Sequence, residues 1–183
     1  MTQIWMTLLI SLALVSKLHP SIAPMEQLLE KPINWESELK ALESSKDTGE
    51  IVPYKDGEFY SVGYGHYLTP EEKDMYEKMS TKERIAQNEK WFKEDIVKHT
   101  NRARKRIPDY DLLSNDLKKN LLFAEFRGSL GLSPKTIKLI NSKNFKGASK
   151  AFLESKEYRD AKKKKSGIAK RMEAVATALA KEK

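Results

Sequence analysis

The sequence contains no cysteine among its 183 residues. This absence excludes a disulfide framework and a thiol nucleophile. Histidine is scarce as well, and the spacing of His19, His66 and His99 does not suggest a shared zinc site. We therefore expect that any hydrolysis by this chain needs neither a metal nor another cofactor.

Long hydrophobic runs are also scarce, and the longest lies at residues 4–15 (IWMTLLISLALV). It is too short to span a bilayer comfortably, which takes about 20 residues, but it matches the apolar core of a secretory signal, about 7–15 residues long. The small residues at 21–23 suit cleavage, whereas Pro24 and the lack of Lys or Arg before the run do not. We expect residues 1–24 to be an export signal, or an anchor that associates with a membrane through residues 4–15. A merely hydrophobic amino-terminal arm is the alternative.

The remaining composition is that of a soluble globular protein, with 39% hydrophobic and 33% charged residues. The length supports one domain, or two small lobes that share a core. Lys and Arg outnumber Asp and Glu by 34 to 26, which gives a formal net charge of +8. This excess favours polyanionic surroundings such as nucleic acid, anionic lipid or a bacterial wall, and it does not select among them.

The pattern after the hydrophobic run predicts a helix followed by a small sheet. Trp35, Leu39 and Leu42 recur at helical spacing, so we expect a helix from about residue 34 to 44. Glycines and a proline punctuate residues 46–66, where aromatic and β-branched residues surround an Asp-Gly turn. This pattern predicts a small antiparallel sheet.

From Thr69 onward the sequence is predicted to be helical. Residues 69–72 (TPEE) and 80–83 (STKE) are typical helix starts, and the second should open a long helix that ends near Pro108. Further helices are expected at about 115–127, 134–141, 145–157 and 167–181, with the lysine run 162–165 as a solvated loop. The predicted fold class is α+β and mostly helical. A small sheet lobe (about 34–79) is joined by the long helix to a helical lobe (about 80–183), both within a domain spanning 25–183.

Two carboxylates could give this arrangement a chemical function. A pair that flanks a glycosidic bond hydrolyses it when one protonates the leaving oxygen and the other activates water or attacks directly. Glu43 ends the first predicted helix, Asp56 lies at the hairpin, and Ser61 follows on the returning strand, where its hydroxyl could hold a water. An acid role requires Glu43 to be partly buried. By spacing alone, a solvated Glu and a turn Asp explain the pattern better than a catalytic pair does.

The hairpin segment 54–66 (YKDGEFYSVGYGH) resembles the signature of the phage-type lysozymes, glycoside hydrolase family 24. In that family a helix ends in the catalytic Glu, and a Tyr-x-Asp strand, a Thr and Gly-x-Gly-His follow. Segments 121–128 (LLFAEFRG), 145–158 and 169–172 resemble the later helices in the same order. The resemblance spans Trp35 to Leu179, and its hairpin is the specific part.

The resemblance implies a muramidase that hydrolyses the β-1,4 bond between N-acetylmuramic acid and N-acetylglucosamine in bacterial peptidoglycan, with inversion. Glu43 takes the role of general acid, Asp56 that of the carboxylate that positions water, and Ser61 stands where the family has Thr. The implied protein is a phage-encoded monomer with peptidoglycan, not nucleic acid, as its partner. We expect it to act from the host periplasm, with the host cytoplasm as the alternative.

The sequence departs from the family at three points. Ser61 keeps the hydroxyl of Thr and loses its methyl, and the interval from Asp56 to Ser61 is one residue shorter. The interval from Glu43 to Asp56 is several residues longer, so Glu50 competes as the acid. We favour Glu43 because it ends an amphipathic helix. For His66 we expect a structural hydrogen bond.

Other residues and other functions remain open. Tyr64, Phe126 and Arg127, together with Tyr60, are candidates to line a saccharide cleft, with core packing as the alternative. The rival functions are a lytic transglycosylase acting on the same bond, because a Ser follows Glu43, and a non-catalytic virion or wall-binding protein on the same scaffold. A nucleic-acid binder, suggested by the basic segment 102–106 (RARKR), is the third rival.

Overall fold

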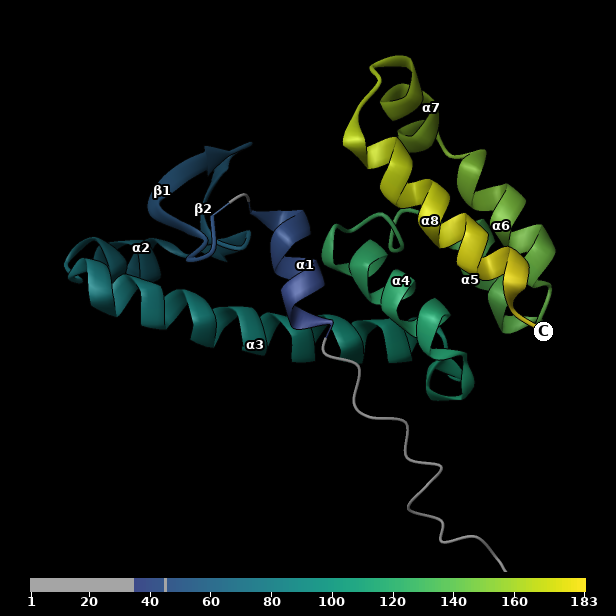
Figure 1. Cartoon of the computed structure of the whole chain (residues 1–183), viewed down its shortest axis with the longest axis horizontal. Helices are drawn as coiled ribbons and strands as arrows, with labels where there is room; N and C mark the ends of the chain where they lie inside the picture. The colour runs from purple at the N-terminus through teal and green to yellow at the C-terminus, as the bar shows by residue number, and fades with distance from the viewer. Residues whose placement is uncertain (1–34, 45) are drawn as a thin grey trace, which may run out of the picture. The chain divides into compact units, whose positions relative to one another are not determined.

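The computed structural model describes residues 35–44 and 46–183, which are mostly helical with one small antiparallel sheet (Figure 1). The predicted α+β, mostly helical class is confirmed. The export or anchor segment predicted at residues 1–24 lies outside the described residues. Among the helices that are described, none has the length and apolar character needed to span a membrane.

The first helix and the sheet follow one another as predicted. Helix α1 (Glu36–Glu43) leads to strands β1 (Glu50–Asp56), β2 (Phe59–Gly63) and β3 (His66–Leu68), which pair antiparallel in that order. The turn between β1 and β2 follows Asp56 and uses Gly57 at φ +64°, a conformation that glycine adopts without strain. The predicted Asp-Gly hairpin is therefore confirmed.

Capping residues fix the next two helix starts. Helix α2 (Pro70–Glu77) is preceded by Thr69, and α3 (Thr81–Arg106) by Ser80. Both hydroxyls accept a hydrogen bond from the backbone N–H three residues on, and both helices carry the reciprocal Glu of a capping box. Because α3 ends at Arg106, shortly before Pro108, its predicted length is confirmed as well.

The carboxy-terminal part is helical throughout, and one predicted helix is corrected. It contains η3 (Tyr110–Leu112), α4 (Asn115–Phe126), α5 (Pro134–Asn141), α6 (Phe145–Leu153), α7 (Lys156–Lys163) and α8 (Gly167–Lys181). The helix expected at 145–157 is divided, because Ser155 has extended backbone angles and its hydroxyl caps α7 by accepting from the N–H of Tyr158. The lysine run 162–165 is therefore only partly a loop, since its first two residues end α7.

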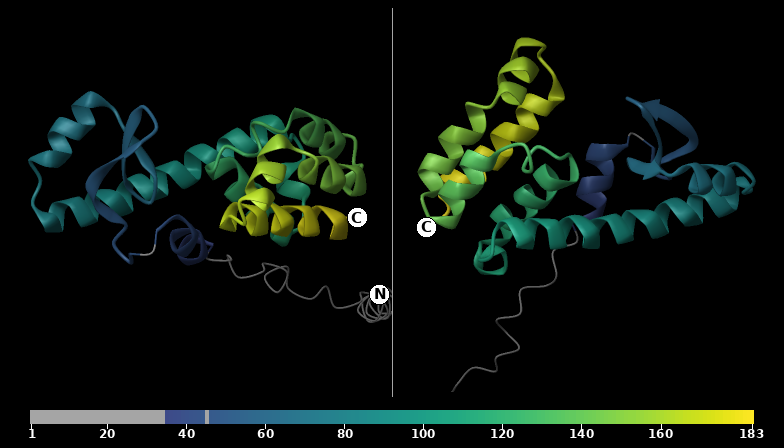
Figure 2. Two further views of the ribbon diagram at one scale, coloured as in Figure 1. Left: turned by 90° about the horizontal axis from the view of Figure 1, so that it is seen from above. Right: turned by 180° about the vertical axis from the view of Figure 1, so that it is seen from behind.

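Helix α3 takes part in more than one core. Toward the middle of the helix, Trp91 packs with Val62 and Leu68 of the sheet and with Tyr76 of α2. Near its end, Ala103 belongs to the large cluster formed by the carboxy-terminal helices. Figures 1 and 2 show that α3 runs from the sheet to these helices. A third cluster joins α1 to the middle of α3 and places the end of α1 between the two larger cores.

Candidate active site

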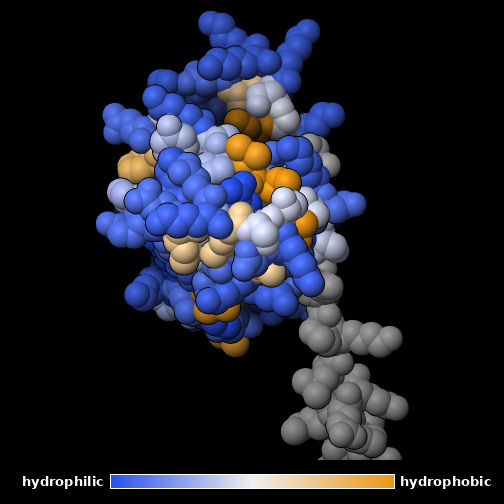
Figure 3. All heavy atoms as spheres, turned by 90° about the vertical axis from the view of Figure 1, so that its left-hand side faces the viewer, coloured by the Kyte–Doolittle hydropathy of each residue, from blue (hydrophilic) through white to orange (hydrophobic). Residues whose placement is uncertain are grey.

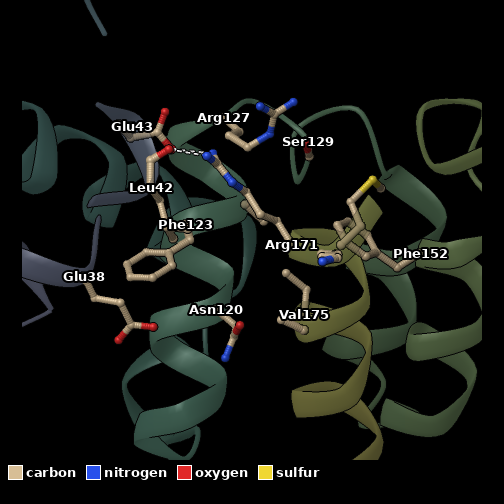
Figure 4. A pocket seen from close by; sticks show the side chains of 14 residues that line it. Glu38, Leu42, Glu43, Asn120, Phe123, Arg127, Ser129, Phe152, Arg171 and Val175 are labelled. Carbon is tan, nitrogen blue, oxygen red and sulfur yellow. Dashed lines mark hydrogen bonds and ion pairs between the residues drawn. The ribbon is translucent and has the colours of Figure 1, made fainter. Parts of the chain in front are cut away.

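Glu43 is the last residue of α1, and its carboxylate contacts an arginine from the last helix. Nη1 of Arg171, on α8, donates a hydrogen bond to Oε1 of Glu43 at 3.1 Å. The same guanidinium donates to the carbonyl oxygen of Leu42, one of the free carbonyls at the end of α1. A cation at this position also interacts favourably with the helix dipole. Arg171 therefore fixes both the end of α1 and the carboxylate that it presents (Figure 4).

The Glu43 carboxyl group holds its proton more tightly than an exposed glutamate does. Burial raises its pKa, because a charged carboxylate is poorly solvated away from water. Arg171 and, to a smaller extent, Arg127 oppose this rise by stabilising the charged form. Since burial outweighs both cations, the net shift favours the protonated acid.

A pocket of about 240 Å³ opens beside Glu43. Helices α1, α4, α6 and α8 contribute side chains to it, and Figure 4 shows them converging from both sides. Its apolar wall includes Phe123, Phe152 and Val175, and Arg127 lies among its polar residues. Phe123 was not predicted as a site residue, although its spacing of four from Arg127 places both on one side of a helical turn.

Arg127 lines this pocket and is held from α7. Its Nη2 donates to Oε1 of Glu157 at 3.2 Å, and the hydroxyl of Ser129 donates to the same oxygen at 3.0 Å. Its Nε is buried without a hydrogen-bond partner among the described residues. The charge that Arg127 exerts on Glu43 is therefore partly offset by Glu157.

Asp56 and Ser61 share one face of the sheet. Tyr54 is the cross-strand partner of Ser61, and Ser61 is that of Tyr67. Directly paired residues point to the same side, as do residues two apart on one strand, so Asp56 lies on this face as well. Asp56 is exposed, whereas Ser61 is fully buried and its hydroxyl oxygen has no hydrogen-bond partner among the described residues.

Tyr54 lies on this face, opposite Ser61 and two residues before Asp56. Burial raises the pKa of its phenol first, and the charges of Asp56, Glu50 and then Glu43 raise it further. The phenol is therefore affected by carboxylates of both β1 and α1, and Glu43 has the smallest influence of the three.

The competing acid, Glu50, has a different environment. It is the first residue of β1, and its carboxylate lies 2.5 Å from Nζ of Lys46, an exposed lysine four residues earlier. It does not line the pocket beside Glu43. The structure therefore gives the two glutamates distinct settings, one beside a pocket and one in a surface ion pair.

Two of the residues expected to line a cleft pack elsewhere, which corrects that expectation. Tyr64 is buried against Leu39 and Phe92, and its hydroxyl donates to the carbonyl oxygen of Asp47 at 2.5 Å. Phe126 packs on Phe92, with ring centroids 6.0 Å apart. Both side chains fill the small core under α1, because an aromatic ring gains more from that burial than from the surface.

Tyr60 also lies away from the Asp56 face. It alternates with Ser61 along β2 and pairs with Lys55, so it points to the opposite side of the sheet. There Nζ of Lys73 lies 4.9 Å from the centroid of its ring. Tyr60 is therefore a surface residue that contacts α2 through Lys73.

His66 has the structural hydrogen bond expected for it. Its Nδ1 lies 2.7 Å from Oδ2 of Asp95, and its ring stacks on Trp91 with centroids 4.3 Å apart. Throughout residues 35–44 and 46–183, no group of three or more His, Asp or Glu side chains is arranged to hold a metal ion.

The basic segment near the end of α3 is partly neutralised within the fold. Arg104 makes a two-pronged contact with Asp111, at 2.9 to 3.1 Å, and Nε of Arg106 lies 3.0 Å from Oε2 of the buried Glu125. Two of the cations that suggested nucleic-acid binding thus have carboxylate partners.

Comparisons of the chain with protein-family models, with curated proteins and with solved structures find no match in any of the three. What the site can do chemically therefore follows from its own residues. They comprise a half-buried carboxyl group bonded to an arginine and, separately, an exposed carboxylate on a sheet face with a buried hydroxyl.

Proposed function

We propose that the chain is a muramidase with a phage-lysozyme-like fold. It hydrolyses the β-1,4 bond between N-acetylmuramic acid and N-acetylglucosamine in peptidoglycan, with Glu43 as general acid. The observation that carries this proposal is the setting of Glu43 at a helix end, beside a pocket, with a pKa raised by burial. A general acid works best when its pKa approaches the working pH, and burial is the usual cause of such a shift.

The Asp56 face supplies what the second half of the reaction needs. The exposed Asp56 carboxylate is available to accept a proton from an attacking water, and we assign the hydroxyl of Ser61, buried on the same face, to hold that water. Both lie on one face of the sheet, and we propose that this face and Glu43 flank the scissile bond. A carboxylate that activates water, instead of attacking the sugar, gives inversion at the anomeric carbon.

The choice of Glu43 over Glu50 has its own support. Glu50 lies in a surface ion pair with Lys46, at 2.5 Å, and does not line the pocket. Glu43 lines the pocket, and burial outweighs its two arginines. The matched variants Glu43→Gln and Glu50→Gln therefore separate the two assignments.

The test is digestion of purified peptidoglycan with mass analysis of the products. The wild type and Glu50→Gln should release muropeptides with reducing ends, and Glu43→Gln should release almost none. Anhydro-muramic ends would identify a lytic transglycosylase. No release by the wild type, with retained binding to wall material, would identify a binding protein on this scaffold.

The proposal extends to where the enzyme works. As a phage-encoded monomer exported or anchored through residues 1–24, it reaches the wall from the host periplasm. The full chain expressed in bacteria should lyse cells without a helper pore, whereas a chain starting at Pro24 should lyse them only with one. Equal lysis by both chains without a pore would refute export.

A further inference from the structure

Two large aromatic side chains on the Asp56 face are exposed. Phe59 is 61% exposed and Tyr67 is 59% exposed, and their ring centroids lie 5.9 Å apart. Figure 3 shows the side of the molecule that is on the left in Figure 1, where scattered apolar residues interrupt a largely hydrophilic surface. Two aromatic side chains exposed side by side make an apolar surface that neighbouring residues leave open, and such patches commonly mark binding sites.

The strand register places this pair next to the groups proposed for water activation. Phe59 is the cross-strand partner of Asp56, and Tyr67 is that of Ser61. Burial and then the charge of Asp56 raise the pKa of the Tyr67 phenol, so its hydroxyl lies near that carboxylate. The two rings therefore extend the same face beyond the carboxylate.

The charge around the pair selects the chemistry of an occupant. Two carboxylates adjoin the pair, since Asp56 shares the face and Glu58 lies in the adjoining turn. Lys55 and Lys73 lie on the side of Tyr60, across the sheet. A phosphate polymer or an anionic lipid would be repelled here, whereas a neutral ring with an apolar face would be accepted.

We propose that Phe59 and Tyr67 form a stacking subsite for one N-acetylhexosamine ring of the glycan strand, at a sugar that is bound but not cleaved. The rings are inclined at 58° to each other, so the C–H face of the pyranose stacks on one ring while the other contacts its edge, and the polar groups are left to Asp56 and water. This subsite deepens the proposed function and rests on it. Its contribution is to substrate binding, not to the proton transfers.

Binding is tested without hydrolysis in the full chain carrying Glu43→Gln, by calorimetric titration with the β-1,4-linked hexamer of N-acetylglucosamine. Phe59→Ala and Tyr67→Ala should each raise Kd about ten-fold, the effect of losing most of one aromatic contact. Phe59→Leu keeps an apolar side chain without the flat ring and should also weaken binding. Tyr60→Ala is the matched control on the opposite face, and it should leave Kd within about two-fold.

Kinetics on soluble glycan strands give a second readout. Phe59→Ala in the otherwise wild-type chain should raise KM and change kcat little, because the contact is made equally in ground and transition states. Affinities for the hexamer that are unchanged in both alanine variants would overturn the subsite, even if the wild type hydrolyses peptidoglycan. Equal weakening by Tyr60→Ala would overturn it too. If the wild type does not hydrolyse peptidoglycan but binds the hexamer, and only the Phe59 and Tyr67 variants lose this binding, the muramidase is refuted and the subsite is kept.

Discussion

The guanidinium of Arg171 bonds to the carboxylate of Glu43 at 3.1 Å, across 128 positions of sequence. It also donates to the Leu42 carbonyl, so one side chain holds both the end of α1 and the acid that the helix presents. The contact stabilises the charged form of Glu43, while burial favours the neutral form more strongly. The protonation of this carboxyl group therefore depends on a balance that mutations can shift in either direction.

Replacing Arg171 with Met should raise the pKa of Glu43 further, because the nearer of its two cations is lost. The alkaline limb of the kcat/KM profile should move to higher pH. Carbon NMR of the labelled Glu43 carboxyl measures the same shift without substrate. Arg171→Lys keeps a cation and should leave the limb closer to the wild type. A limb that moves to lower pH would show that Arg171 does not act through its charge.

Replacing Glu157 with Gln should shift the pKa of Glu43 in the opposite direction, to a lower value. Arg127 loses the carboxylate that offsets it, so its charge acts more strongly on Glu43 and lowers the pKa of that group. The alkaline limb should move to lower pH, by less than Arg171→Met moves it upward, because Arg127 is the weaker influence. Lys156→Met, at the residue before Glu157 on α7 and paired with Asp160, is the control and should leave the profile in place.

Glu43→Gln should reduce activity by about 10²–10⁴-fold, the usual contribution of general acid catalysis. It should also become more stable relative to the wild type as pH rises. The pKa of Glu43 is higher in the folded state than the ordinary 4.5, so the folded wild type binds more protons and its free energy of unfolding falls as pH rises above 4.5. Gln cannot ionise and escapes this loss. Urea unfolding at pH 4 and pH 7 checks it, and a difference between the proteins that does not change with pH would contradict it.

His99 should make the protein sensitive to acid. Burial and then Arg102 lower its pKa to about 4, from 6.5. The unfolded state therefore binds more protons between these values, and stability that is present above pH 6.5 is lost as pH falls toward 4. His99→Gln should flatten the fall in the free energy of unfolding across this window. Denaturation curves at half-unit steps would show an unchanged slope if His99 is not responsible.

The first product should be the α-anomer if Asp56 activates a water. Inversion needs room for that water, with about 6.5–9.5 Å between the carboxyl groups, against about 5–5.5 Å in retaining enzymes. Proton NMR of the initial product from a soluble glycan identifies the anomer. Ser61→Ala should slow hydrolysis, because the water is held less firmly. A β-product would mean that Asp56 acts as a nucleophile or that the pair is wrongly chosen.

Short-range chemistry made much of the fold predictable from the sequence. The hydroxyls of Thr69 and Ser80 cap helices through backbone groups three residues away, and Gly57 suits the turn after Asp56. The same logic applied at Ser155, where a local cap divides a run that is continuous in hydrophobic pattern. The hydrophobic periodicity of residues 145–157 predicts one helix, and the capping hydroxyl of Ser155 alone does not distinguish it from two.

The sequence by itself determined most of the elements, their order, and the positions of Glu43 at a helix end and of Asp56 at a hairpin, but not the break between α6 and α7. Only the tertiary structure decided which residues surround them. The pairing of Glu43 with Arg171, the burial of Tyr64 and the exposure of Phe59 beside Tyr67 depend on packing and strand register. Contacts of this kind join residues that are distant along the chain, and the local pattern around each residue carries no signal of its partner.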